Sequence, residues 1–247
     1  MKTINLNRNL FRVLLPAVLL CSIVLAQEPP RTRSLTIGGK DVTEKSDGME
    51  IKILKNVSNS WKLVGPNEKF KAGDRVKVQF WSNIKGYVYF VNIPPSGKQK
   101  VIYSQAIEKD RDYTLPGSDG NREVWIDFDD EKGIEILKLV MTPSPIKVFD
   151  DAINKSKGEL GESVFSVTKE LANVPKVESE QVAMISKNGG CPKVRELSIR
   201  CRSLGFAPSD PKSNKGAVAV AIPDSKNSSG KLAKDEAIVV ELRLIHI

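Results

Sequence analysis

Apolar and polar residues alternate along much of the chain between residues 49 and 145, which is the pattern of half-buried β-strands. Segment 75–82 shows the alternation most clearly, with Val76, Val78 and Phe80 on one face and Arg75, Lys77, Gln79 and Trp81 on the other. The polar neighbours of Trp81 give no reason for its burial. Trp81 is therefore the candidate for an exposed ligand contact.

The next segment, Gly86 to Ile93, is apolar at almost every position and predicts a central strand covered on both faces. With segment 75–82 and the turn between them, it is predicted to form a hairpin in the middle of a sheet. Tyr87 and Tyr89 share one face of this strand, and we expect them to pack in the core with their hydroxyls near its rim. Together with Trp81 and Trp125 they form the set of possible ligand contacts.

Further strands are predicted at 49–57, 61–64 and 101–103, and segment 122–142 is predicted to form two strands joined by an acidic turn from Asp129 to Gly133. The polar stretch 105–121 is predicted to be a loop. Pro143 and Pro145 end the last of these strands. Two short helices are expected within 146–158 and 162–174 from apolar residues at helical spacing. Strand-like patterns return at 193–201, 216–222 and 236–247. The terminal strand is so apolar that we expect it to pair inside the main sheet.

These elements predict a mainly β fold, an immunoglobulin-like or related antiparallel β-sandwich with one or two short helices and a C-terminal strand returning to the sheet. The expected organisation is listed by range: a signal peptide over 1–26, an N-terminal extension over 27–48, a sandwich core over 49–148, short helices and loops over 149–193, and C-terminal strands over 194–247 that contain a flexible hairpin loop at 223–235. No internal repeat or long heptad pattern is visible.

The N-terminal segment has the layout of a secretory signal, with Lys2, Arg8 and Arg12 before an uncharged run from Val13 to Leu25. We expect cleavage after Ala26 and a secreted or periplasmic protein with no membrane span in the mature chain. An uncleaved N-terminal anchor is the alternative. Lipidation of Cys21 is disfavoured, because Leu19 and Leu20 precede it where a small residue is needed.

Charge and cysteine content agree with export. The chain has 38 Lys+Arg against 30 Asp+Glu, and the basic residues are scattered among acids with no run interleaved with aromatics, so nucleic acid is not an expected partner. Without Cys21 the mature chain keeps Cys191 and Cys201, which are predicted to form a disulfide in an oxidising compartment, with two free thiols as the alternative.

Few residues offer catalytic chemistry. The one histidine, His246, stands next to the C-terminal residue, and no nucleophile motif is visible, so we expect no catalytic residue, cofactor or metal. The acidic turn 127–131 contains Asp127 and Asp129, but its spacing departs from that of a calcium loop, so calcium binding there stays open. A hydrolase using such carboxylates is a minor alternative.

Two segments, Phe70 to Tyr103 and Gly133 to Pro145, carry a set of short motifs in a fixed order: Phe70, Gly73-Asp74, Gly86-Tyr87-x-Tyr89, Gly97 and Gly133-x-Glu135. In these motifs the chain resembles the bacterial family catalogued as domain of unknown function 4384, over about residues 49–145. The resemblance implies an accessory or interaction role in an exported protein, since similar domains accompany caspase-like or kinase modules. It implies no catalytic residue.

The preferred hypothesis is therefore an exported, non-enzymatic envelope protein that binds another envelope protein through a sheet edge or an aromatic strip. The alternative is a carbohydrate or cell-wall binding protein that uses exposed aromatic rings.

Overall fold

The strands that the sequence predicts assemble into two mostly antiparallel sheets in the computed structural model of the chain. The structure describes residues 36–37, 40–65, 68–119, 122–160, 164–165, 185–186, 192, 199–202, 204–208, 217–225 and 229–247. The predicted signal segment 1–26 and Cys191 lie outside this part of the chain, and so does all of the expected helix 162–174 except Val164 and Phe165.

Sheet I has seven strands among the described residues, ordered β12-β6-β3-β17-β16, with β4 beside β3 and β9 beside β6. Their bounds are β3 Gly48–Val57, β4 Ser60–Leu63, β6 Arg75–Ser82, β9 Arg111–Leu115, β12 Ile126–Asp127, β16 Gly205–Pro208 and β17 Ala217–Ala221.

Sheet II also has seven described strands, ordered β14-β18-β13-β7-β8, with short β15 and β5 running parallel to β18. Their bounds are β5 Lys69–Phe70, β7 Gly86–Ile93, β8 Lys100–Ile107, β13 Gly133–Thr142, β14 Ile185–Ser186, β15 Arg200–Cys201 and β18 Glu236–His246. Two small ribbons complete the described strands: β1 Thr36–Ile37 with β2 Lys40–Asp41, and β10 Ser118–Asp119 with β11 Arg122–Glu123.

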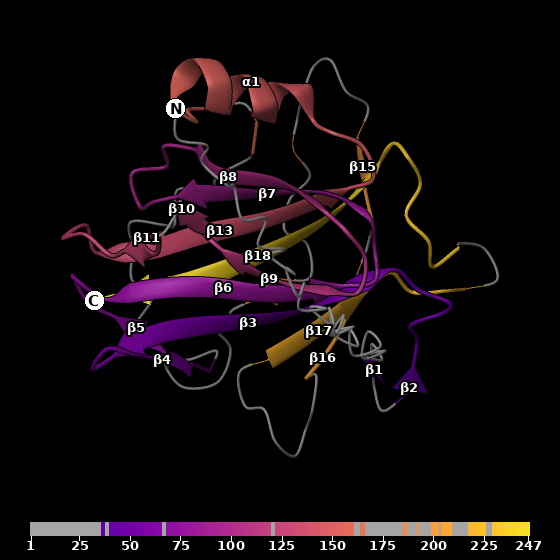
Figure 1. The fold of residues 1–247 in the computed structure, drawn as a ribbon, viewed down its shortest axis with the longest axis horizontal. Helices are drawn as coiled ribbons and strands as arrows, with labels where there is room; N and C mark the ends of the chain where they lie inside the picture. The colour runs from indigo at the N-terminus through magenta and orange to yellow at the C-terminus, as the bar shows by residue number, and fades with distance from the viewer. Residues whose placement is uncertain are drawn as a thin grey trace, which may run out of the picture. The chain divides into compact units, whose positions relative to one another are not determined.

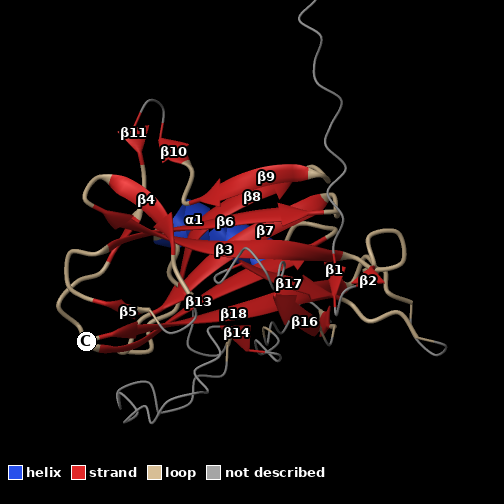
Figure 2. Ribbon diagram, turned by 90° about the horizontal axis from the view of Figure 1, so that it is seen from below, coloured by secondary structure: helices blue, strands red, loops and turns tan. Residues whose placement is uncertain are grey.

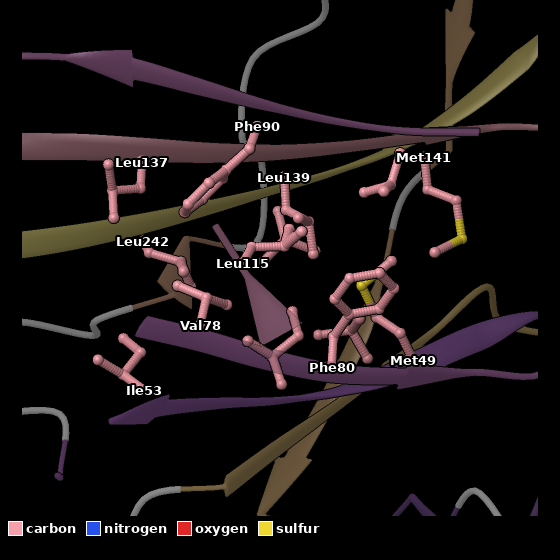
Figure 3. Close-up of a cluster of buried hydrophobic side chains, with 14 of the residues drawn as sticks. Met49, Ile53, Val78, Phe80, Phe90, Leu115, Leu137, Leu139, Met141 and Leu242 are labelled. Carbon is pink, nitrogen blue, oxygen red and sulfur yellow. The ribbon is translucent and has the colours of Figure 1, made fainter. Parts of the chain in front are cut away.

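The main core lies between the two sheets, so the fold is a β-sandwich, as the alternation predicts. Figure 3 shows Phe90, Leu137 and Leu139 of sheet II facing Val78 and Phe80 of sheet I, all of them almost fully buried. Alternate residues of each strand supply this layer, because successive side chains of a strand point to opposite faces.

Helix α1, Lys147–Ser156, covers the outer face of sheet II and makes it the middle of three layers (Figures 1 and 2). Its buried Phe149 and Ala152 pack with Tyr89 and Val140 in a second apolar cluster. The helix ends at Ser156, its C-cap Lys157 has the left-handed φ of 52°, and Gly158 follows with φ 88°. Helix α1 confirms the first expected helix. Because it covers the outer face of sheet II, it also explains why β7 is apolar on both faces.

Two expectations about the middle of the chain are wrong. The strands β6 and β7 do not form a hairpin, because β6 pairs with β3 in sheet I while β7 pairs with β13 in sheet II. The stretch 105–121 is not only a loop, since β8 runs on to Ile107 and β9 pairs with β6.

The C-terminal strands take central places in both sheets. In sheet I, β17 pairs with β3, and in sheet II the long β18 lies between β13 and β14, as expected of so apolar a terminal strand. The loop 223–235 therefore crosses from one sheet to the other, so the expectation of a hairpin there is wrong. Asp47 meets this loop through its carboxylate, which accepts the Leu232 N–H at 2.8 Å.

Candidate functional site: a tryptophan face on sheet I

Trp81 is buried, contrary to the expectation of an exposed contact. Its side chain lies on the outward face of sheet I, but it packs against Ala219 and Ala221 of β17 and against Val42, and only 3% of the residue is exposed. The small alanine side chains of β17, which lies beyond β3 in the sheet, leave room for the indole. Trp81 is therefore part of a small satellite core that attaches the segment around Val42 to sheet I.

Tyr89 is also unavailable to a ligand, as the preferred interpretation of this strand predicts. It is fully buried, and its hydroxyl accepts the Ile146 N–H at 2.7 Å just before α1 begins. Burial raises the pKa of this phenol. Tyr87 is half-buried on the same outward face of sheet II, whereas Trp81 lies on sheet I, so the possible ligand contacts do not share one surface.

Trp125 lies on the opposite side of the sandwich, on the outward face of sheet I, and is half-buried. The Arg75 guanidinium carbon is 4.4 Å from the centre of its ring. Asp127 holds both groups, because its Oδ1 accepts the indole N–H at 2.8 Å and lies 3.4 Å from Arg75 Nε. Trp125, Arg75 and Asp127 thus fix one another in a single cluster.

Trp61, which the sequence did not single out, belongs to a second cluster of the same kind. Its indole N–H donates to Glu123 Oε1 at 2.9 Å, and Lys77 Nζ lies 4.7 Å from the centre of its ring. Lys77 also pairs with the same carboxylate oxygen. The hydrogen bond from Lys77 holds the pKa of Glu123 below its ordinary value.

The two clusters are neighbours because Arg75 and Lys77 are two residues apart on β6 and therefore point to the same face. We call the surface formed by Trp61, Trp125, Arg75, Lys77, Glu123 and Asp127 the tryptophan face. The positive charges of its two cations equal the negative charges of its two carboxylates. The alternation of Arg75 and Lys77 correctly marked this face as outward, but the position of Trp61 depends on the pairing of β4 with β3, which no local pattern reveals.

Phe70 and Asp74, two of the residues that carry the family resemblance, stabilise the fold through their packing and their hydrogen bonds. Phe70 is fully buried and stacks on Phe128 with ring centres 4.7 Å apart. Asp74 accepts the Lys71 N–H at 2.8 Å and pairs with Lys55 at 2.7 Å. They hold the turn before β6 against the end of the sandwich and offer no reactive group to solvent.

The remaining candidate groups lie apart from one another. His246 is 2% exposed, and its Nδ1 is 2.7 Å from the Glu131 carbonyl oxygen, while Nε2 has no hydrogen-bond partner. In the acidic turn, Asp129 accepts the Glu131 N–H at 2.8 Å. No group of three His, Cys, Asp or Glu side chains within the described ranges could hold a metal ion. Cys201 lies half-buried in β15 beside β18.

Comparison with known proteins confirms the resemblance stated from the motifs. The family model for Domain of unknown function (DUF4384) matches residues 69–145, which run from β5 to the turn after β13. No curated protein and no solved structure matches the chain. Among the helical residues that the structure places, none forms a helix of the length and hydropathy needed to span a membrane.

Proposed function

We propose that this chain is an exported, non-enzymatic binding protein of a bacterial envelope, and that it contacts another envelope protein through the tryptophan face. The observation that carries the proposal is the pair of Trp–cation–carboxylate clusters on one outward sheet face. Tryptophan and arginine are the residues most enriched among those that dominate protein-protein binding. A sheet face that is exposed only to solvent needs neither tryptophan nor arginine for its stability.

The geometry of both clusters suits binding because the rings are already fixed. Each indole N–H has a carboxylate partner and each ring has a cation over it, so little side-chain freedom remains to be lost on association. The balanced charge of the face also favours a partner held by ring contacts over one held by net charge. These features support a preorganised contact surface.

Export and a non-enzymatic role are supported by other features. The pattern of residues 1–26 is that of a secretory signal, and a disulfide between Cys191 and Cys201 would suit the compartment reached. The absence of an enzymatic role is proposed because His246 is buried at one end of the sandwich, while Asp127 is engaged by Arg75 and Trp125.

Site-specific photo-crosslinking in cells that export the protein tests the proposal. A photoreactive residue replaces Asn56, the cross-strand neighbour of Trp61, and in the control it replaces Lys155, which is exposed on α1 in the opposite layer. We expect one envelope protein to be captured from position 56 alone. Trp61→Ala and Trp125→Ala should each weaken binding of that purified partner about tenfold or more.

Equal capture from both positions, or an affinity unchanged by both alanine variants, would refute the proposed surface. Carbohydrate binding is the competing outcome, since the Asp127 carboxylate beside the Trp125 ring is 62% exposed and could accept hydroxyl groups. In that case peptidoglycan fragments would change the tryptophan fluorescence of the wild type, and Trp125→Ala would abolish the change.

A further inference from the structure

The outer edge of β8 is paired only at its beginning by described residues. There the chain itself supplies a partner: the Val101 N–H donates to the Gly158 carbonyl at 2.7 Å, and the Leu160 N–H donates to the Gln99 carbonyl at 2.9 Å. An antiparallel bridge joins Lys100 to Glu159 between them. From Ile102 to Ile107, no strand within the described ranges pairs with this edge.

Beyond the bulge at Ile102, the open part of the edge lacks the usual protection against pairing. Natural edge strands carry charges, prolines or bulges that discourage another strand from adding to them. Residues Ile102 to Ala106 contain neither charge nor proline, and the one irregularity of β8, opposite Phe90 and Val91, comes at the start of this run. The edge is therefore suited to receive a strand about 20 Å long.

A groove of about 520 Å³ lies along this edge, between β8 and the C-terminal turn of α1. Ile102 and Ser104 line it from the strand, and Ile153, Lys157 and Gly158 line it from the helix side. The volume is within the range of pockets that bind small ligands and short peptide segments. Figure 1 shows α1 above β8 in this arrangement.

Positive charge gathers at one end of the groove. Lys100 and Lys157 both line it and both are exposed, and Glu159 is the one carboxylate that the described part of the chain places near this end. The C-terminus of α1 adds only about half a negative charge, which two lysine side chains outweigh. An anionic group is therefore favoured where Gly158–Leu160 begins to pair with β8.

We propose that an extended peptide adds to β8 from Ile102 to Ile107, antiparallel to it, with a free C-terminal carboxylate between Lys100 and Lys157. The direction follows from residues 158–160, which already run antiparallel to the beginning of β8. The peptide lies in line with them along the same edge, so its C-terminal end is next to Gly158. Main-chain hydrogen bonds supply affinity, and alternate side chains meet Ile153 and Ser104 in the groove. The inference rests on the proposed function as a binding protein but assigns a second site.

A random heptapeptide library with free C-termini, panned against the purified full chain, tests the proposal. We expect enrichment of peptides whose binding is weakened about tenfold or more when the carboxylate is converted to an amide. The double variant Lys100→Glu, Lys157→Glu should lose the same peptides. The matched control Lys155→Glu, which changes a lysine on α1 outside the groove, should retain them.

Amide chemical shifts locate the bound peptide, and they should change from Ile102 to Ala106. A Ser104→Arg variant with unchanged melting temperature fills the groove and should abolish these changes. No enrichment, equal binding of acid and amide peptides, or shift changes elsewhere would each overturn the proposal. Because Trp61→Ala and Trp125→Ala leave the β8 edge intact, loss of peptide binding and loss of the crosslinked partner are separate results.

Discussion

At the scale of single residues, the short motifs are explained by packing. Gly86 opens the Gly86-Tyr87-x-Tyr89 motif because β7 approaches β13 there more closely than a side chain allows. A Cβ atom on Gly86 would lie 2.2 Å from the Thr142 carbonyl oxygen, which is main chain and cannot move aside alone. Three positions later, Tyr89 fastens the start of α1 through its hydroxyl. The motif thus joins a strand contact to a helix contact.

Gly86→Ala should destabilise the protein by about 3 kcal/mol, at the upper end of the cost of overpacking, because two main chains must separate. Gly97→Ala is the control. It places a side chain in open space and meets only the strain of its positive φ of 80°, which costs about 1–2 kcal/mol. Urea unfolding measures both variants, and a Gly86→Ala variant as stable as the wild type would contradict the close approach.

Glu135 provides a pH-dependent prediction. It shares the inward face of β13 with Leu137 and is 9% exposed, and burial raises its pKa above the ordinary value of 4.5, although a hydrogen bond from Asn92 opposes the rise. Asp129 and Glu131 raise this pKa further, and His246 lowers it. A group whose pKa is raised by folding contributes its full stability below its unfolded pKa and loses it as pH rises through the folded pKa.

Glu135→Gln removes this titration. We therefore expect the stability of the variant relative to the wild type to increase between pH 4 and pH 7, because above the unfolded pKa the unfolded wild type loses the Glu135 proton while the folded wild type still holds it. Urea unfolding at both pH values measures the difference. A relative stability that stays constant, or that falls with rising pH, would show that Glu135 is not held in its protonated form.

At the scale of elements, the sequence predicts faces well and partners poorly. The period-two pattern of segment 75–82 correctly separates the core face from the outward face, and the double-sided apolarity of β7 correctly predicts cover on both faces. The same patterns cannot say that β6 and β7 belong to different sheets, because pairing is decided by distant strands, β3 and β13. Trp81 is buried by Ala219 and Ala221, which are remote in sequence.

The ion pair between Lys138 and Glu241 favours the observed register of β13 and β18. The two residues face each other across the strands, their charged atoms are 2.6 Å apart, and both side chains are almost fully buried. Burial lowers the pKa of Lys138, so its charge depends on the carboxylate opposite. A shift of the register would separate the two charged groups and leave each one buried without the other.

Glu241→Leu should cost about 3–5 kcal/mol, because it leaves the buried lysine without this carboxylate. The double variant Lys138→Met, Glu241→Leu should recover most of that loss, since a buried ion pair and an apolar pair are often similar in stability. A double-mutant cycle in urea measures both. If the double variant is no more stable than Glu241→Leu, the carboxylate matters for another reason, such as its contact with Arg243 at 2.7 Å.

At the scale of the whole molecule, the matched segment is smaller than the folded unit. Residues 69–145 include β7 and β13 of sheet II and β6 and β9 of sheet I. Their neighbours β3 and β18 come from outside this range, and so does β17, which pairs with β3. Strand β18 pairs with β13 over nine residue pairs from Gly133 to Met141. The segment alone would expose one edge of β13, one edge of β6 and a large part of the inward apolar faces.

We therefore expect an isolated fragment of residues 69–145 not to fold, whereas the chain from residue 36 to 247 should unfold cooperatively. Apolar burial is the main force that stabilises a domain, and the fragment loses the side chains of Met49, Ile51, Val240 and Leu242 from the central core. Amide chemical-shift dispersion and urea titration measure the difference. Cooperative unfolding of the fragment would mean that the matched segment builds its own core, and that β3, β17 and β18 were added around a complete domain.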